Sequence, residues 1–173
     1  MAADTTTSSR PDARFLVSHP AHFIALGFGS GLAPVAPGTF GTLAGWGIAA
    51  VLMLFVPPLF VAFLTIPLIV LGIWACDVTG RHLGVQDHPA MVFDEIVAFL
   101  PLAAVASAAW WLQLVAFLIF RFFDIAKPYP IRQLEVAVKG GLGVMADDLV
   151  AGFYSFIAFA LFVVLMHKGL GFQ

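Results

Sequence analysis

The chain has 173 residues, of which 61% are hydrophobic and only 10% are charged, and its mean hydropathy is +1.01. A soluble domain is nearer half apolar and a quarter charged, so this composition argues against a soluble domain and indicates an integral membrane protein. The formal net charge of −2 argues against a nucleic-acid partner, and the length suggests one domain. A single cysteine, Cys76, excludes an intramolecular disulfide and a multi-thiolate metal site.

The amino-terminal part of the chain changes character twice. Residues 1–14, MAADTTTSSRPDAR, are polar and lack the apolar segment of a signal peptide, so we expect a flexible tail. The rest, 15–173, is then a single membrane-embedded domain, and its first stretch, 15–28, is mildly apolar and suits the membrane interface. Residues 27–45, GFGSGLAPVAPGTFGTLAG, are rich in glycine and proline, which predicts irregular backbone outside the hydrocarbon core or packed inside protein.

Apolar stretches that predict helices follow. Residues 44–56 read as a short helix that ends at a pair of prolines, and residues 59–76 return across the membrane. A polar loop is expected at 77–95. The last span is expected at 149–166, LVAGFYSFIAFALFVVLM.

The block at 96–120 allows two topologies. Its length, about 25 residues, suits one tilted spanning helix, but a single span would put the polar loops 77–95 and 121–147 on opposite membrane faces. Two short helices that turn near 105–111 return both loops to one face. This hairpin gathers on that face the basic residues Arg10, Arg14, Arg81, Arg121, Lys127, Arg132 and Lys139. Because positive charge prefers the cytoplasm, we expect the hairpin and a cytosolic amino terminus.

The expected fold is therefore an all-α integral membrane protein, a compact bundle of about five short membrane helices with cytosolic polar loops. A small interfacial helix is expected at 131–138, where IRQLEVAV places apolar residues on one face. The glycine pair Gly140 and Gly141 ends this helix.

Acidic residues fall at the ends of the predicted helices. The first loop contributes Asp87, Asp94 and Glu95, and the second contributes Asp124, Asp147 and Asp148. Each pair of adjacent acids would open a helix, and there it could simply complement the helix dipole, with Asp94 as an N-cap. Together, however, several carboxylates on one membrane surface repel each other unless a cation lies among them. Oxygen ligands without thiolate or histidine spacing favour Mg²⁺.

Two basic residues follow Asp124 closely. Asp124 and Lys127 are three residues apart and face one another on a helix, while Pro128 disfavours helical backbone at Lys127. Lys127 and Arg132 would then project from a stiff segment, where Arg132 can grip a phosphate bidentately and Lys127 can act as a point charge. The alternative is an ordinary basic cluster that touches anionic lipid.

The glycine-rich segment offers a second anion site. Glycines at a helix start can cradle an anion through backbone N–H groups, and Thr39 and Thr42 could add hydroxyls. Close helix packing is the alternative for Gly41, Gly45 and Gly47. The segment has no Lys-Ser/Thr ending, so it is not a nucleoside-triphosphate loop.

Four segments in order resemble the phosphatidylglycerophosphatase A family of bacteria. They are GFGSGLAPVAPGTFGTLAG, VFDEIVAFL, FRFFDIAKPYPIR and KGGLGVMADDLVAG, and the similarity runs from about Phe23 to about Tyr154. The resemblance implies a Mg²⁺-dependent phosphatase of the bacterial inner (cytoplasmic) membrane, multi-pass, with its site facing the cytoplasm. It would hydrolyse the terminal phosphate of phosphatidylglycerophosphate to give phosphatidylglycerol, with membrane lipid around it.

The same resemblance carries the family's motif positions onto this sequence. The catalytic candidates are Asp94, Asp124, Lys127 and Arg132. The metal candidates are Asp87, Asp94, Glu95, Asp147 and Asp148. The substrate-binding candidates are Gly29, Ser30, Gly31, Gly38, Thr39, Lys127 and Arg132. The nucleophile stays open between a metal-activated water and a carboxylate such as Asp94 or Asp124.

Two other classes of protein compete with the phosphatase. A small cation or proton transporter would also hold acids near helix ends, but its acids should fall mid-span, and no Asp or Glu interrupts an apolar run here. A non-catalytic protein that binds anionic lipid would use the basic residues without needing so many carboxylates. The sequence leaves the oligomeric state open.

Overall fold

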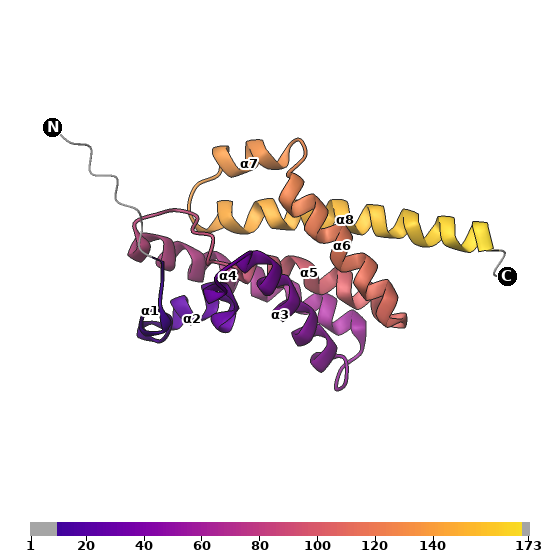
Figure 1. Cartoon of the computed structure of the whole chain (residues 1–173), viewed down its shortest axis with the longest axis horizontal. Coiled ribbons are helices and arrows are strands. Elements are labelled where there is room, and N and C mark those ends of the chain that lie inside the picture. Colours follow the sequence, from indigo (N-terminus) through magenta and orange to yellow (C-terminus); the bar gives the residue numbers. More distant parts are fainter. Residues whose placement is uncertain (1–9, 171–173) are drawn as a thin grey trace.

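The computed structural model describes residues 10–170, and every regular element within that range is helical (Figure 1). The all-α prediction is therefore confirmed for this part of the chain. The elements are α1 (Ala13–Ser18), α2 (Pro20–Ala25), the 3-10 turn η1 (Gly27–Leu32), α3 (Pro37–Leu52), α4 (Pro58–Leu83), α5 (Phe93–Val105), the 3-10 turn η2 (Ala106–Ala108), α6 (Trp110–Ala126), α7 (Ile131–Ala137) and α8 (Gly141–Leu170).

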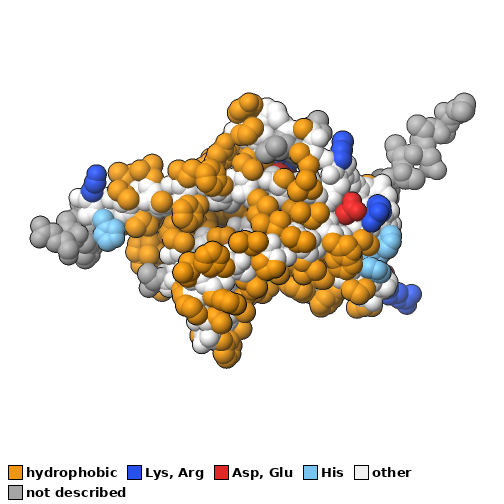
Figure 2. All heavy atoms as spheres, turned by 180° about the vertical axis from the view of Figure 1, so that it is seen from behind, with side chains coloured by type: hydrophobic (Ala, Val, Ile, Leu, Met, Phe, Trp, Pro, Cys, Tyr) orange, Lys and Arg blue, Asp and Glu red, His pale blue; other side chains and the backbone are white. Residues whose placement is uncertain are grey.

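Two helices are long and apolar enough to cross a membrane, α4 and α8 (Figure 1). The most apolar window of each has a mean hydropathy of 2.5, yet only 28% of that window in α4 and 22% in α8 is buried inside the protein. A core helix of a soluble protein would be mostly buried. Figure 2 shows apolar side chains over most of one face, with charged and histidine side chains gathered at its two ends.

The other predicted spans are shorter than a full membrane crossing. Helices α3, α5 and α6 have 16, 13 and 17 residues, whereas about 20 residues cross a hydrocarbon core of about 30 Å. The bundle of five membrane helices therefore remains a prediction.

The block at 96–120 is broken into two helices, as the hairpin requires. Helix α5 ends at Val105, η2 follows, and Ala109 is extended, with φ −155° and ψ 144°, before Trp110 starts α6. The two helices return on one another, because Arg121 Nη1 near the end of α6 lies 3.8 Å from Glu95 Oε1 in the first turn of α5. A single continuous helix over this block is excluded.

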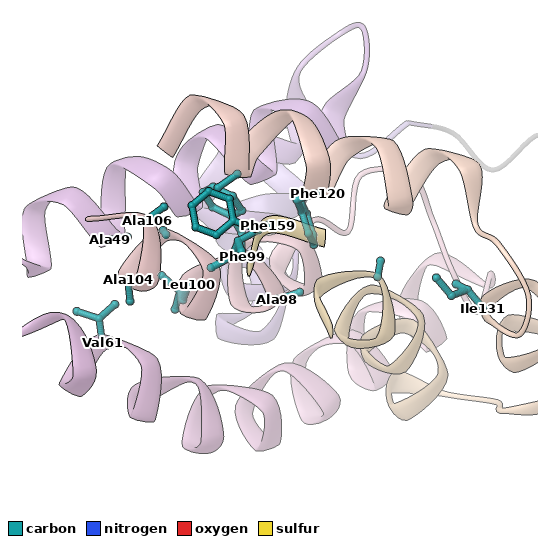
Figure 3. Packing of buried hydrophobic residues seen from close by; sticks show 14 residues of the cluster. Ala49, Val61, Ala98, Phe99, Leu100, Ala104, Ala106, Phe120, Ile131 and Phe159 are labelled. Carbon is teal, nitrogen blue, oxygen red and sulfur yellow. The ribbon is translucent and has the colours of Figure 1, made fainter. Parts of the chain in front are cut away.

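Helix α5 is the centre of the fold. Ten of its 13 residues are buried, and it packs against α3, α4 and α8. Phe99 of α5 packs on Phe120 of α6 with ring centroids 5.6 Å apart, and both belong to a buried apolar cluster that also includes Ala49 of α3 (Figure 3). The packed core therefore holds the first turn of α5 in place.

Glycines allow the close approach of neighbouring helices to α5. A Cβ on Gly45 of α3 would lie 3.0 Å from the Ile96 Cα, and one on Gly41 would lie 2.6 Å from the Val92 Cβ. Both positions therefore need glycine for packing. Gly47 differs, because a Cβ there would meet nothing within 4 Å.

The prediction of irregular backbone over 27–45 is wrong in its second half. Helix α3 begins at Pro37, a favoured first helical residue because its fixed φ suits the helix and its missing N–H is not needed there. Before it, Ala36 has a left-handed φ of 47°. Gly38 and Thr39 therefore lie in the first turn of a helix.

Two further boundaries also differ from the prediction. The polar loop 77–95 begins later than expected, because α4 continues to Leu83, supported by an ion pair of 3.1 Å between Asp77 and Arg81 one turn apart. Helix α4 is capped at its C-terminus by Gly84, whose φ of 70° suits that position. Asp147 and Asp148 do not open a helix, because α8 already begins at Gly141. Asp94 is not an N-cap either, since Val92 holds that position.

The amino-terminal boundary falls inside a helix. Residues 1–9 of the predicted tail lie outside the described residues. Asp12 caps α1 by accepting a hydrogen bond of 2.8 Å from the Phe15 N–H, and Arg10 donates one of 3.1 Å to the Pro34 carbonyl. After α6, helix α7 covers Ile131–Ala137 and so agrees with the helix predicted at 131–138.

Candidate active site

Two helices bring acidic side chains to one buried place. Helix α5 contributes Asp94 and Glu95 from its first turn, and α8 contributes Asp148 from its second. One carboxylate oxygen of each of these three residues lies within 4.8 Å of the other two. We call this group the carboxylate triad. Asp94 is only 6% exposed and Asp148 only 4%.

The carboxylate triad has the features of a cation site. Three carboxylates this close together and this well buried can be ionised at the same time only if a cation lies among them. Glu95 Oε2 is buried and has no hydrogen-bond partner among the described residues, which costs free energy unless a ligand satisfies it. Oxygen ligands from carboxylates are those that Mg²⁺ takes, usually with water and a phosphate completing the shell. The residues present therefore fit a magnesium ion.

Arg121 of α6 lies beside the triad and connects it to two other elements. Its Nη1 atom forms an ion pair with Asp124 one turn along and lies 3.8 Å from Glu95 Oε1. The same nitrogen donates a hydrogen bond of 3.3 Å to Thr42 Oγ1 of α3. The sequence interpretation counted Arg121 only among the cytosolic basic residues, although its spacing of three from Asp124 was the available signal for this role.

Lys127 points back into the molecule rather than away from it. It caps the end of α6 in a left-handed conformation, with φ 40° and ψ 62°. Its Nζ atom lies 2.6 Å from Asp147 Oδ2, and the Asp147 side chain is only 5% exposed. Pro128 does end the helix as predicted, but Lys127 and Arg132 do not project together. Arg132 is exposed on α7.

The predicted metal residues therefore separate into different environments. Asp94, Glu95 and Asp148 meet in the triad, Asp147 pairs with Lys127, and Asp87 is exposed in the loop before α5. The predicted catalytic Asp124 lies outside the triad and pairs with Arg121.

The glycine-rich segment reaches the site at Gly38 and, one turn further on, at Thr42. A Cβ on Gly38 would lie 2.1 Å from Glu95 Oε1 and 3.2 Å from Arg121 Nη1, so any other residue would displace the charged groups. The carbonyl of Gly38 also accepts a hydrogen bond of 3.0 Å from Thr42 Oγ1. The N–H of Thr39 is already bonded to the Ala36 carbonyl. Gly38 thus allows close packing over the site.

The first half of the segment is used for local structure. Gly29 has a φ of 101°, which suits glycine, and Ser30 Oγ donates to the Gly27 carbonyl at 2.7 Å. A Cβ on Gly31 would lie 2.0 Å from the Ala90 carbonyl oxygen, so this residue allows η1 to pack on the loop before α5. These contacts pack η1 against the loop that leads into α5.

Over residues 10–170 the fold and the site together define an all-helical protein with exposed apolar helices and a buried acid cluster beside Arg121. Comparison with known proteins identifies the family. Residues 23–163 match the family described as Phosphatidylglycerophosphatase A. The chain belongs to this family, and it is a phosphatase.

Relatives cover nearly the whole chain. A phosphatidylglycerophosphatase A of Haemophilus influenzae is 40% identical over 152 residues, 87% of this chain and 93% of its own. One of Escherichia coli is 39% identical over 162 residues, 91% of both chains. A protein of Bacteroides thetaiotaomicron named putative phosphatidylinositol-3-phosphatase is 43% identical over 145 residues, 80% of this chain and 90% of its own. No solved structure matches the chain.

Proposed function

We propose that this protein hydrolyses the terminal phosphate of phosphatidylglycerophosphate, with Mg²⁺, at the cytoplasmic face of the bacterial inner membrane. The observation that carries the proposal is the carboxylate triad with Arg121 beside it. The names of two relatives that align over most of their length support this substrate. The products would be phosphatidylglycerol and inorganic phosphate.

The carboxylate triad would hold the metal ion. When bound, Mg²⁺ neutralises charge on the phosphoryl oxygens and orients the phosphate. The fit rests on the short spacing of Asp94, Glu95 and Asp148 and on the buried Glu95 oxygen without a hydrogen bond among the described residues.

The side chains around the triad would bind and activate the substrate. The guanidinium Nε of Arg121 is buried and has no hydrogen-bond partner in residues 10–170. A phosphate oxygen would accept a charge-assisted hydrogen bond from it. Asp124 lies beside Arg121 but outside the triad, which suits it to accept a proton from an attacking water. Asp94 lies within the triad and would serve first as a ligand. Arg132, exposed on α7, would meet the headgroup as it enters.

A position in the membrane follows from the exposed apolar surface. Helices α4 and α8 would cross the bilayer, and the shorter helices would pack against them. The end of the molecule that carries Arg81, Arg121 and Lys127 would face the cytoplasm, because positive residues prefer that side. Substrate would then enter sideways from the inner leaflet.

A transporter fits the arrangement less well. Its acids should line a path through the middle of the membrane, whereas the triad lies at the ends of helices, near the break between α4 and α5. The related protein named as a phosphoinositide phosphatase shares the same reaction class, removal of a phosphate from a phospholipid headgroup.

A substrate panel tests the proposal. The purified protein is placed in vesicles that carry phosphatidylglycerophosphate, phosphatidylinositol 3-phosphate or phosphatidic acid, and released phosphate is measured. We expect release from phosphatidylglycerophosphate well above the other two. Faster release from the phosphoinositide would transfer the proposal to that substrate, and no release from any lipid would contradict it.

A further inference from the structure

An apolar groove lies between α5 and α8, on a side where α8 exposes apolar side chains. Its volume is about 270 Å³. Its lining includes Ala98, Pro101, Leu149, Gly152, Phe153 and Phe156. None of its lining residues has a charged or hydrogen-bonding side chain. Phe153 and Phe156 are 61% and 41% exposed, so the groove opens outward.

The groove continues directly from the carboxylate triad. Ala98 follows Asp94 by four residues on α5, and Gly152 follows Asp148 by four residues on α8. Residues four apart lie on the same face of a helix, about 6 Å apart along its axis. The floor of the groove therefore begins one turn beyond the triad, on the same two helices and on the same faces.

Glycine and proline shape this groove. Gly152 lies so close to α5 that a Cβ would be 3.0 Å from the Ala98 carbonyl oxygen, which brings the two helices together at the floor. Pro101, within α5, adds an apolar ring to the wall. From Leu149 to Phe156 the groove extends about 10 Å along α8, enough for a segment of an extended hydrocarbon chain.

We propose that this groove binds one acyl chain of the phospholipid substrate, next to the headgroup. The inference rests on the proposed function, because the charges that would hold the phosphate lie at one end of the groove and apolar walls form the rest. A lipid tail has no hydrophobic gain on leaving other lipid tails. The groove instead acts by packing and position: it aligns the chain so that the phosphate reaches the triad.

Removing the groove wall gives the kinetic test. The double variant Phe153→Ala/Phe156→Ala is compared with Leu161→Ala/Leu165→Ala, which removes two similarly exposed apolar side chains of α8 outside the groove. The readout is the ratio of kcat/KM for long-chain phosphatidylglycerophosphate to that for a short-chain form that dissolves without a bilayer. We expect this ratio to fall about threefold to tenfold in the groove variant only. If the ratio of long-chain to short-chain kcat/KM were the same in the groove variant and in the control variant, the groove assignment would be overturned.

Photo-crosslinking tests occupancy without depending on catalysis. The probe is phosphatidylglycerophosphate with a diazirine in one acyl chain, added to Asp148→Asn protein in vesicles. We expect adducts at Leu149, Phe153 or Phe156 that excess short-chain phosphatidylglycerophosphate removes and phosphatidylethanolamine does not. Equal competition by both lipids, or equal labelling of Leu161 and Leu165, would show bulk lipid contact and reject the proposal. If the wild type hydrolyses no lipid, the proposed function fails while the crosslinks still decide whether the groove binds this lipid.

Discussion

The ammonium group of Lys127 lies 2.6 Å from Oδ2 of Asp147, and this contact joins the end of α6 to the second turn of α8. The two residues are 20 positions apart, and α7 lies between them in the sequence. Arg121 makes the equivalent link from α6 to the first turn of α5. These two cations hold the three helix ends around the carboxylate triad.

The Lys127–Asp147 pair should matter for stability as well as for activity. Lys127→Met leaves a buried carboxylate without its lysine, which should lower the free energy of unfolding by about 3 kcal/mol. Adding Asp147→Asn should restore part of that loss, because the uncompensated charge is then gone. Chemical denaturation in detergent measures both variants. Arg132→Ala, at an exposed position, should change stability by less than about 0.5 kcal/mol. Equal losses in Lys127→Met and Arg132→Ala would contradict the role of the pair.

Mutual repulsion in the triad predicts an effect of charge removal on stability. In EDTA, Asp148→Asn should unfold at a higher temperature than the wild type, since one of three crowded carboxyl groups, each destabilised by burial and by its neighbours, is removed. Saturating Mg²⁺ should stabilise the wild type, by about 2.7 kcal/mol at a hundredfold excess over Kd, and should have little effect on the variant. A melting temperature that Mg²⁺ leaves unchanged in the wild type would argue against a metal site here.

Arg121 should be needed for catalysis even though it is not a triad member. Arg121→Lys keeps the charge but loses the planar donor set, so kcat should fall about 100-fold or more. Arg81→Lys is the matched control, because Arg81 is exposed and pairs with Asp77 across one turn of its own helix. Activity of Arg121→Lys close to that of the control would show that simple charge is sufficient at this position.

The buried histidines predict a pH dependence of stability. His22 is 3% exposed, and its Nε2 lies 2.7 Å from His82 Nδ1. Burial lowers the pKa of His22 below 6.5, the charges of His82 and His19 lower it further, and a hydrogen bond to the Phe15 carbonyl opposes the shift. Burial also lowers the pKa of His88.

For such groups the unfolded chain binds more protons than the folded one once the pH falls below about 6.5. Stability should therefore be fully present above pH 6.5 and should decline as the pH falls toward the lowered pKa. Melting temperatures at pH 7.5 and 5.5 measure the decline, which should be smaller in His22→Gln and unchanged in His167→Gln at an exposed site. An identical pH dependence in all three proteins would contradict the assignment to His22.

The topology can be tested by thiol labelling in intact cells. With Cys76 replaced, single cysteines are introduced at Gln86, Gln133 and Leu59, all of which are exposed. Because the triad joins both polar segments at one end, Gln86 and Gln133 should label from the cytosol and Leu59 from outside. Labelling of Gln86 and Gln133 from opposite sides would be incompatible with a single site.

The sequence predicted the helical class and the break near 105–111, because composition and small residues act locally, and it singled out the three acids that the fold brings together. It did not predict that Arg121 and Lys127 turn inward, since that depends on how the α5–α6 hairpin packs against α8. The start of α3 could have been found from Pro37 at a first helical position. The start of α8 could not, because the residues between the glycines and Asp147 are apolar and suit either a loop or a helix.

The separation of the acids into different roles also required the fold. Asp147 and Asp148 are neighbours in sequence, but adjacent helical residues point about 100° apart, so one faces Lys127 and the other faces the triad. Once the extent of α8 is known, this division follows from helix geometry. With both acids placed at a helix start, the sequence interpretation treated them as equivalent ligands.

Phosphate release from phosphatidylglycerophosphate in vesicles, with Mg²⁺ or with EDTA, tests the central claim most directly when wild type and Asp148→Asn are measured side by side. Wild type should release phosphate with Mg²⁺ and stop in EDTA, and folded Asp148→Asn should be slower by at least the roughly 100-fold that changes around metal ligands can reach. Equal release by the wild type in Mg²⁺ and EDTA, or full activity of Asp148→Asn, would contradict a metal-dependent site built on the carboxylate triad.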